Sequence, residues 1–267
     1  QLSPVPLNNK QIVLNESFEK AIEDNEFEVY FQPKINLDNE KTAGAEALVR
    51  WKHKEYGMIS PGEFISLFEV NGKICRLDLY VFEIVCKKLN EWKERELPPI
   101  KVSVNLSRVH LMEQGIECLK RFKDIKDKYQ IPDGQIELEL TESMVIEIKQ
   151  LEKIKKIIAQ IQACGFLCSL DDFGSGYSSL ALLKEFDVDI IKLDRLFFVN
   201  GNEKTWKVVK AFISLAHELN ITVVAEGVEE KYQIEKLKEI NCDLIQGYVY
   251  ARPLPEEEFV TWIEERR

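Results

Sequence analysis

Short apolar segments rich in β-branched residues alternate along the chain with longer amphipathic segments. The expected strands are Val29–Ile35, Ala43–Val49, Ile100–Leu106, Ile136–Thr141, Phe166–Asp171, Ile190–Asp194, Thr222–Ala225 and Leu244–Tyr248. In the intervening segments apolar residues recur every three or four positions, which indicates helices, most clearly over Glu16–Asn25, Phe82–Trp92, Leu151–Ile161 and Trp206–Leu219. Eight strands that alternate with helices in about 250 residues predict an α/β fold, a single (β/α)8 TIM-like barrel.

The connection between the first two strands departs from this pattern. Only residues 36–42 separate them, whereas a parallel crossover needs about a dozen residues or more. We therefore expect an antiparallel hairpin, and so a barrel with an antiparallel first strand. The opening Gln1-Leu-Ser-Pro-Val-Pro6 is neither a signal peptide nor an initiator methionine. The expected organisation is a linker from a longer protein over residues 1–16 and one domain over 17–267.

Composition and charge exclude several classes of protein. The 267 residues carry 46 acidic and 36 basic side chains, a formal charge of −10, and 45% are hydrophobic, which excludes a disordered chain. An acidic protein does not coat DNA or RNA polymers, although a local pocket can bind a small anion. No stretch of about 18 apolar residues predicts a membrane span. Six cysteines without a CxxC pair predict buried, reduced thiols. We therefore expect a cytoplasmic protein, or the cytoplasmic part of a membrane-anchored one.

Polar side chains gather where the expected strands end, and this is where a barrel enzyme carries its chemistry. The candidates are Glu46, Asn105, Glu142, Asp171, Asp172 and Glu226. Carboxylates crowded in one mouth repel one another unless a cation lies among them, and carboxylates with one amide suit Mg²⁺ or Mn²⁺. The adjacent aspartates could serve two ions, as in phosphoester hydrolysis.

A lysine and a glycine-rich loop belong to the same region. Lys192 lies in an apolar strand and needs a charge partner, so we expect it to point into the barrel mouth. Gly174 and Gly176 favour a mobile loop beside the aspartates. Each residue alone also has an ordinary interpretation, such as a solvated glutamate or an N-cap aspartate. Recurrence at consecutive strand ends favours a functional site.

Four segments carry a family resemblance. Glu46-Ala-Leu48 with Arg50-Trp51, Asp171-Asp-Phe-Gly-Ser-Gly-Tyr-Ser-Ser-Leu180, Ala225-Glu-Gly-Val-Glu229 and Gln246-Gly-Tyr248 resemble the EAL domain family of bacterial cyclic di-GMP phosphodiesterases. The similarity runs from about Phe18 to Trp262. The resemblance implies a barrel with an antiparallel first strand and two divalent ions, Mg²⁺ or Mn²⁺.

The resemblance also implies a role for each matching residue. Glu46, Asn105, Glu142 and Asp171 would hold one ion, and Asp171, Asp172 and Glu226 the second. Among the catalytic residues, which include Glu46, Lys192 would lie beside the attacking water, Gln246 would contact that water or the second ion, and Glu229 would brace the glycine-rich loop. Arg50 would contact a substrate phosphate, Gln32 and Leu48 would line the nucleotide, and Asp194 is placed with these substrate-binding residues.

Departures from the family pattern are few. Ser175 stands where threonine is usual, and a usual acidic pair is reduced to Glu69, which we expect on a helix away from the metals. The resemblance implies hydrolysis of cyclic di-GMP to linear 5'-pGpG by a homodimer with an upstream sensory or GGDEF-type domain. The alternative is a catalytically silent cyclic di-GMP receptor or protein-interaction domain. Without the resemblance, Lys192 among carboxylates would also fit an enolase-like or aldolase site.

Overall fold

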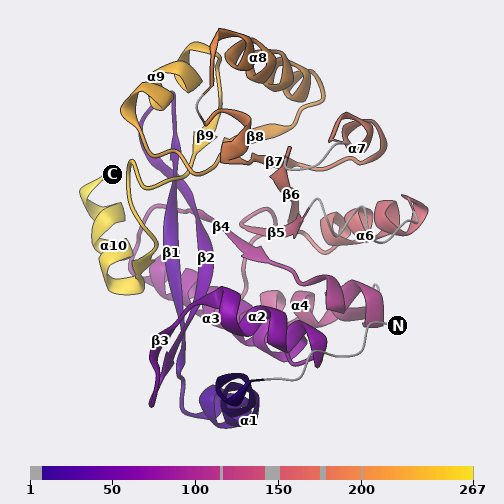
Figure 1. The fold of residues 1–267 in the computed structure, drawn as a ribbon, viewed down its shortest axis with the longest axis vertical. Coiled ribbons are helices and arrows are strands. Elements are labelled where there is room, and N and C mark those ends of the chain that lie inside the picture. Colours follow the sequence, from indigo (N-terminus) through magenta and orange to yellow (C-terminus); the bar gives the residue numbers. More distant parts are fainter. Residues whose placement is uncertain (1–7, 115–116, 142–150, 175–178, 200, 267) are drawn as a thin grey trace.

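Eight strands close a barrel in the computed structural model, which describes residues 8–114, 117–141, 151–174, 179–199 and 201–266 (Figure 1). The strands are β1 (Phe27–Asn36), β2 (Thr42–His53), β4 (Lys101–Asn105), β5 (Ile136–Thr141), β6 (Leu167–Phe173), β7 (Ile190–Leu193), β8 (Thr222–Ala225) and β9 (Leu244–Ile245). They follow the order β1-β9-β8-β7-β6-β5-β4-β2, and pairing of β2 with β1 closes the ring. Strand β1 is antiparallel to both neighbours, and the other neighbours in the ring are parallel. The predicted barrel with an antiparallel first strand is confirmed.

Helices surround the barrel on its outer face (Figure 1). They are α1 (Asn9–Glu23), α2 (Pro61–Val70), α3 (Ile74–Glu94), α4 (Glu117–Lys128), α6 (Leu151–Ala163), α7 (Ser179–Glu185), α8 (Glu203–Glu218), α9 (Lys231–Glu239) and α10 (Glu256–Glu265). The periodicity that predicted these helices marks their buried faces: in α3, Phe82, Val85, Leu89 and Trp92 are all buried. Two short strands, β3 (Gly57–Ile59) and β10 (Leu254–Pro255), extend the sheet beyond the ring and were not predicted.

The first helix begins earlier than expected. It starts at Asn9, where Asn8 accepts a hydrogen bond from the Gln11 backbone and the Gln11 side chain accepts one from the Asn8 backbone, forming a capping box. Leu14, within the expected linker, is buried in the core. The expected start at Glu16 is therefore wrong, because the capping residues lie further upstream.

The last strand is shorter than expected and ends at Ile245 instead of Tyr248. At Gly247 the chain runs directly against the backbone of Val228, and a Cβ there would lie 2.1 Å from the Val228 carbonyl oxygen. This close approach turns the chain out of the sheet immediately after Gln246.

Two observations bear on the class of protein. Within the described ranges, no helix combines the length and the apolar composition needed to cross a bilayer. All six cysteines lie in these ranges, each is buried, and none forms a disulfide.

Candidate active site

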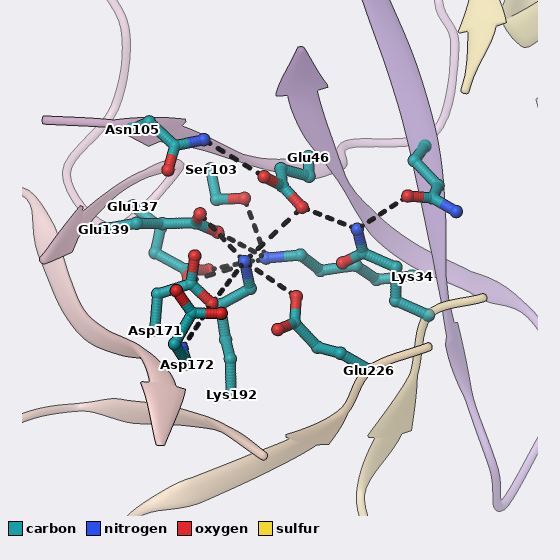
Figure 2. Close-up of polar contacts among 12 residues, drawn as sticks. Lys34, Glu46, Ser103, Asn105, Glu137, Glu139, Asp171, Asp172, Lys192 and Glu226 are labelled. Atoms are coloured by element: carbon teal, nitrogen blue, oxygen red, sulfur yellow. Dashed lines mark hydrogen bonds and ion pairs between the residues drawn. The ribbon is translucent and has the colours of Figure 1, made fainter. Parts of the chain in front are cut away.

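A buried lysine lies at the centre of the barrel mouth. The side chain of Lys192 on β7 is 1% exposed, and its Nζ lies 2.8 Å from Glu139, 2.8 Å from Glu226, 3.2 Å from Asp171 and 3.4 Å from Glu46. These four carboxylates come from β5, the segment after β8, β6 and β2, respectively, and converge on the ammonium group (Figure 2). The barrel thus brings together groups that are distant in sequence. We call Glu46, Glu139, Asp171, Asp172 and Glu226 the acidic cluster.

The charges in this cluster are strongly coupled. Burial alone would lower the pKa of Lys192, but the surrounding carboxylates outweigh burial and hold it well above its usual value. Lys192 in turn overcomes burial at Glu46 and Asp171 and lowers the pKa of both. Burial and the neighbouring Glu46 raise the pKa of Glu139 to about 8, and burial together with Asp171 raises that of Glu226. The carboxyl groups therefore cannot all be ionised beside one ammonium, and some of them keep their protons in the metal-free site.

Asn105 and Asp172 complete the group predicted from the strand ends. Asn105, the last residue of β4, donates from Nδ2 to Glu46 Oε1 over 3.1 Å. Asp172 has a backbone φ of 55°, a left-handed conformation uncommon outside glycine. Burial and the neighbouring Asp171 raise the pKa of the Asp172 carboxyl. Figure 2 shows both residues at the edge of the cluster.

Gln246 connects the cluster to the first strand. Its Nε2 donates to Glu46 Oε2 over 2.6 Å and to Gln32 Oε1 over 3.0 Å, and Gln32 donates to the carbonyl of Ala251. These two acceptors fix the orientation of the Gln246 amide. Its Oε1 is then buried without a hydrogen-bond partner in the described part of the chain. A buried acceptor of this kind calls for a bound donor such as water.

Glu139 is the residue that the sequence reasoning missed. Polar and apolar residues alternate along β5, so Glu137 and Glu139 share the face that points into the barrel. This alternation was readable in the sequence and could have identified Glu139. Glu142 was chosen instead, and it lies outside the described residues.

A cleft of about 450 Å³ opens beside the cluster. Leu48 and Arg50 from β2 line it together with Asn105. The Arg50 guanidinium donates to the carbonyl of Val49 over 2.8 Å and lies 5.7 Å from the centre of the Tyr30 ring. The cleft is large enough for a nucleotide-sized ligand.

Glu69 lines the same cleft as Asn105. It lies on α2, a helix, as expected, and its distance from the metals stays a prediction. Its Oε1 accepts a hydrogen bond from Ser107 Oγ over 2.8 Å. Asp78 also lines the cleft, and its pKa is raised by burial. This side of the cleft is therefore acidic and offers acceptors to a ligand with N–H groups.

Two predicted site residues make their hydrogen bonds and ion pairs outside the acidic cluster, although Asp194 is close enough to Asp172 to help raise the pKa of its carboxyl. Glu229 is half-exposed and pairs with Arg195 over 3.3 Å. Asp194 accepts a hydrogen bond from the backbone of Leu196 over 2.7 Å and so caps the short helix Arg195–Phe197. Residues 175–178 of the glycine-rich loop lie outside the described residues, so a bracing role for Glu229 stays a prediction.

The donor set fits hard divalent cations by its chemistry. In the described part of the chain, no three His, Cys, Asp or Glu side chains are grouped tightly enough to form a metal-ligand cluster. Four of the carboxylates contact Lys192 instead. Carboxylate and amide oxygens with a buried, unpartnered Gln246 Oε1 are suited to Mg²⁺ or Mn²⁺ with bound water.

Comparison with known proteins identifies the family. The family model for the EAL domain matches residues 15–253. The chain therefore belongs to the EAL domain family. It is 32% identical over 253 residues to the cyclic di-GMP phosphodiesterase NbdA of Pseudomonas aeruginosa, covering 92% of this chain and 31% of NbdA. It is 36% identical over 245 residues to the probable cyclic di-GMP phosphodiesterase PdeB of Escherichia coli, covering 92% of this chain and 46% of PdeB.

Solved structures have the same fold as this EAL domain. The PaMucR phosphodiesterase in its c-di-GMP complex matches with a TM-score of 0.84 at 31% identity, covering 92% of this chain and 99% of that one. An EAL domain protein from Listeria monocytogenes matches with a TM-score of 0.80 at 29% identity, covering 98% of this chain and 100% of that one. The chain spans about a third of the length of the first curated relatives it matches.

Proposed function

We propose that this EAL domain hydrolyses cyclic di-GMP to linear 5'-pGpG and that the reaction depends on Mg²⁺ or Mn²⁺. The observation that carries the proposal is the acidic cluster around Lys192, which lies at the carboxyl ends of parallel strands beside a cleft. The names of relatives such as NbdA support the substrate. A cyclic dinucleotide carries two negative charges, so an acidic site needs cations to accept it.

The charge in the cluster supports two ions. Fully ionised, its five carboxylates would leave a charge of −4 against the ammonium of Lys192, which two divalent cations would balance. In the metal-free cluster the raised pKa values of Glu139 and Glu226 keep part of this charge protonated, so bound cations would displace those protons. Glu46, Asn105 and Asp171 would hold one ion, with Glu139 as the described β5 carboxylate beside them and Glu142 still a prediction. Asp171, Asp172 and Glu226 would hold the second. Bound cations of this kind polarise phosphoryl oxygens and lower the pKa of water.

The side chains of the chain itself position the reacting groups. Lys192 would offset negative charge that develops on the phosphoryl oxygens as the P–O3' bond breaks. Gln246 would accept a hydrogen bond from the attacking water through its unpartnered Oε1. Arg50, from the wall of the cleft, would hold the phosphate in line with that water.

A turnover assay tests the proposal. Protein with Mg²⁺ or Mn²⁺ is expected to release pGpG, and a chelator or Lys192→Met to stop the release. Binding of cyclic di-GMP with no pGpG under any of these conditions would instead establish the silent receptor. An aldolase role is not favoured, because a Schiff-base lysine must be neutral, whereas four carboxylates keep Lys192 charged.

We also propose that the domain forms a homodimer and works beside other domains. Helix α8 exposes Val208 and Leu215, and its C-cap residue Leu219 is also exposed. Exposed apolar residues spaced in this way favour self-association. The relatives are longer than this chain, and MucR is named a bifunctional diguanylate cyclase and phosphodiesterase, which supports a GGDEF-type neighbour. The six buried thiols support a reducing, cytoplasmic setting. Light scattering of wild type and Val208→Glu tests the dimer, and a monomeric wild type would contradict it.

A further inference from the structure

A second lysine lies inside the barrel beside Lys192. Lys34 of β1 is 3% exposed, and its Nζ lies 2.8 Å from Ser103 Oγ, 3.3 Å from Glu137 Oε2 and 3.4 Å from Glu139 Oε1. Ser103, Glu137 and Glu139 are buried as well. Figure 2 shows the two ammonium groups side by side between the carboxylates.

Glu139 connects the two lysines. Its Oε1 contacts Lys34, and its Oε2 contacts Lys192 over 2.8 Å. Because each oxygen is held by a different ammonium, the plane and the direction of the carboxylate are fixed. Ser103 and Glu137 contact the same ammonium group of Lys34 and so hold it in place.

We propose that Lys34 is a positioning residue, which fixes Glu139 so that this carboxylate faces Lys192 and the cation site. The proposal rests on the proposed function in taking the acidic cluster as the active site. Lys34 is buried, and the member of the acidic cluster that it contacts directly is Glu139.

The cost of burying Lys34 supports a specific role. Taking an ammonium out of water is expensive, and an apolar side chain of similar volume is often equally stable or more stable at such a position. Burial alone would lower the pKa of Lys34, but Glu137 and Glu139 outweigh burial and raise it. The barrel therefore keeps a full positive charge beneath Glu139.

The direction in which Mn²⁺ affinity changes distinguishes a positioning role of Lys34 from a role in charge balance alone. In Lys34→Met a positive charge is lost, so charge balance alone predicts tighter Mn²⁺ binding. In Lys34→Met with Glu137→Gln the formal charge is unchanged, so charge balance predicts wild-type affinity. Positioning predicts weaker binding in both, by about 10–100-fold, the usual effect of losing a group that orients a metal ligand.

Mn²⁺ binding is measured by electron paramagnetic resonance without substrate, and kcat and KM with cyclic di-GMP. We expect kcat to fall in the double variant while KM stays near the wild-type value. The matched control is Lys126→Met, which also removes a buried lysine but one whose partner is the surface residue Asp133. It is expected to change neither quantity.

The outcomes are distinguishable. Wild-type Mn²⁺ affinity in the double variant overturns the positioning role, and so does a wild-type protein that binds no Mn²⁺. A wild type that binds Mn²⁺ but releases no pGpG overturns only the proposed hydrolysis, and the Mn²⁺ measurement still decides the role of Lys34. If Lys34→Met fails to fold, the charge-balanced double variant carries the test.

Discussion

Divalent cations should stabilise this EAL domain against unfolding, because the acidic cluster exists only in the folded chain. The carboxyl groups of the cluster converge on Lys192, and its members are separated in sequence by up to 180 residues, from Glu46 to Glu226. A ligand that binds only the folded state at about 100 times its Kd adds about 2.7 kcal/mol. For a domain of this size, that corresponds to a rise in Tm of about 5–11 °C.

Replacing one carboxylate shows whether the cluster is responsible. Glu46→Gln keeps an oxygen that can accept from Asn105 or Gln246 but removes one charge. If this weakens cation binding tenfold, the stabilisation at the same Mn²⁺ concentration falls by about 1.4 kcal/mol. The assay is thermal unfolding with and without Mn²⁺, and the control is Glu203→Gln on the exposed surface of α8. A Mn²⁺ shift that is absent in wild type, or equal in wild type and Glu46→Gln, would refute the reasoning.

Three further predictions follow from buried groups. The pKa of Glu139 is raised to about 8 in the metal-free fold against 4.5, so the folded state binds the extra proton, and stability falls as pH rises from 4.5 to 8, by up to about 1.4 kcal/mol per pH unit. Urea midpoints should show this slope in wild type and a smaller one in Glu139→Gln, in which Glu226, whose pKa is also raised, still contributes; equal slopes would contradict the assignment. Burial raises the pKa of Cys118 to about 11 and of Cys86 to about 12, so under about a thousandth of each is thiolate at pH 8. A thiol reagent should label none of the six cysteines until urea is added, and rapid native labelling would show that the core opens. Gly247→Ala should cost about 3 kcal/mol in urea unfolding, because its Cβ would meet backbone; an unchanged midpoint would mean that the Val228 segment moves freely.

The pattern of hydrophobic and polar residues along the chain was sufficient to predict the barrel architecture. Alternation of strand and helix patterns predicted the barrel, and the short connection over residues 36–42 predicted the antiparallel β1, because chain length alone limits how two strands can be joined. The location of the chemistry followed from the rule that active sites lie at the carboxyl ends of barrel strands.

The buried contacts of Lys34 with Ser103 and Glu137 could not be predicted in the same way. Lys34, Ser103 and Glu137 meet only because β1, β4 and β5 are in a particular register, and register depends on the whole closed sheet. Lys34 alone reads as an ordinary strand residue. To choose between Glu139 and Glu142, one must know which side chain points into the barrel. The alternation of polar and apolar residues along β5 indicates this direction, whereas the family motif does not.

Strand β2 continues well past the rim of the barrel, and this has a mechanical consequence. The strand that carries Glu46 and Arg50 runs on to His53, which lies 3.3 Å from Ser17 of α1, and Trp51 donates to Glu26 just after that helix. The first helix therefore rests on the outer half of the strand whose inner half carries cation and substrate residues. Any force that displaces α1 would be transmitted along one continuous, hydrogen-bonded segment, so cation affinity and substrate affinity should change together.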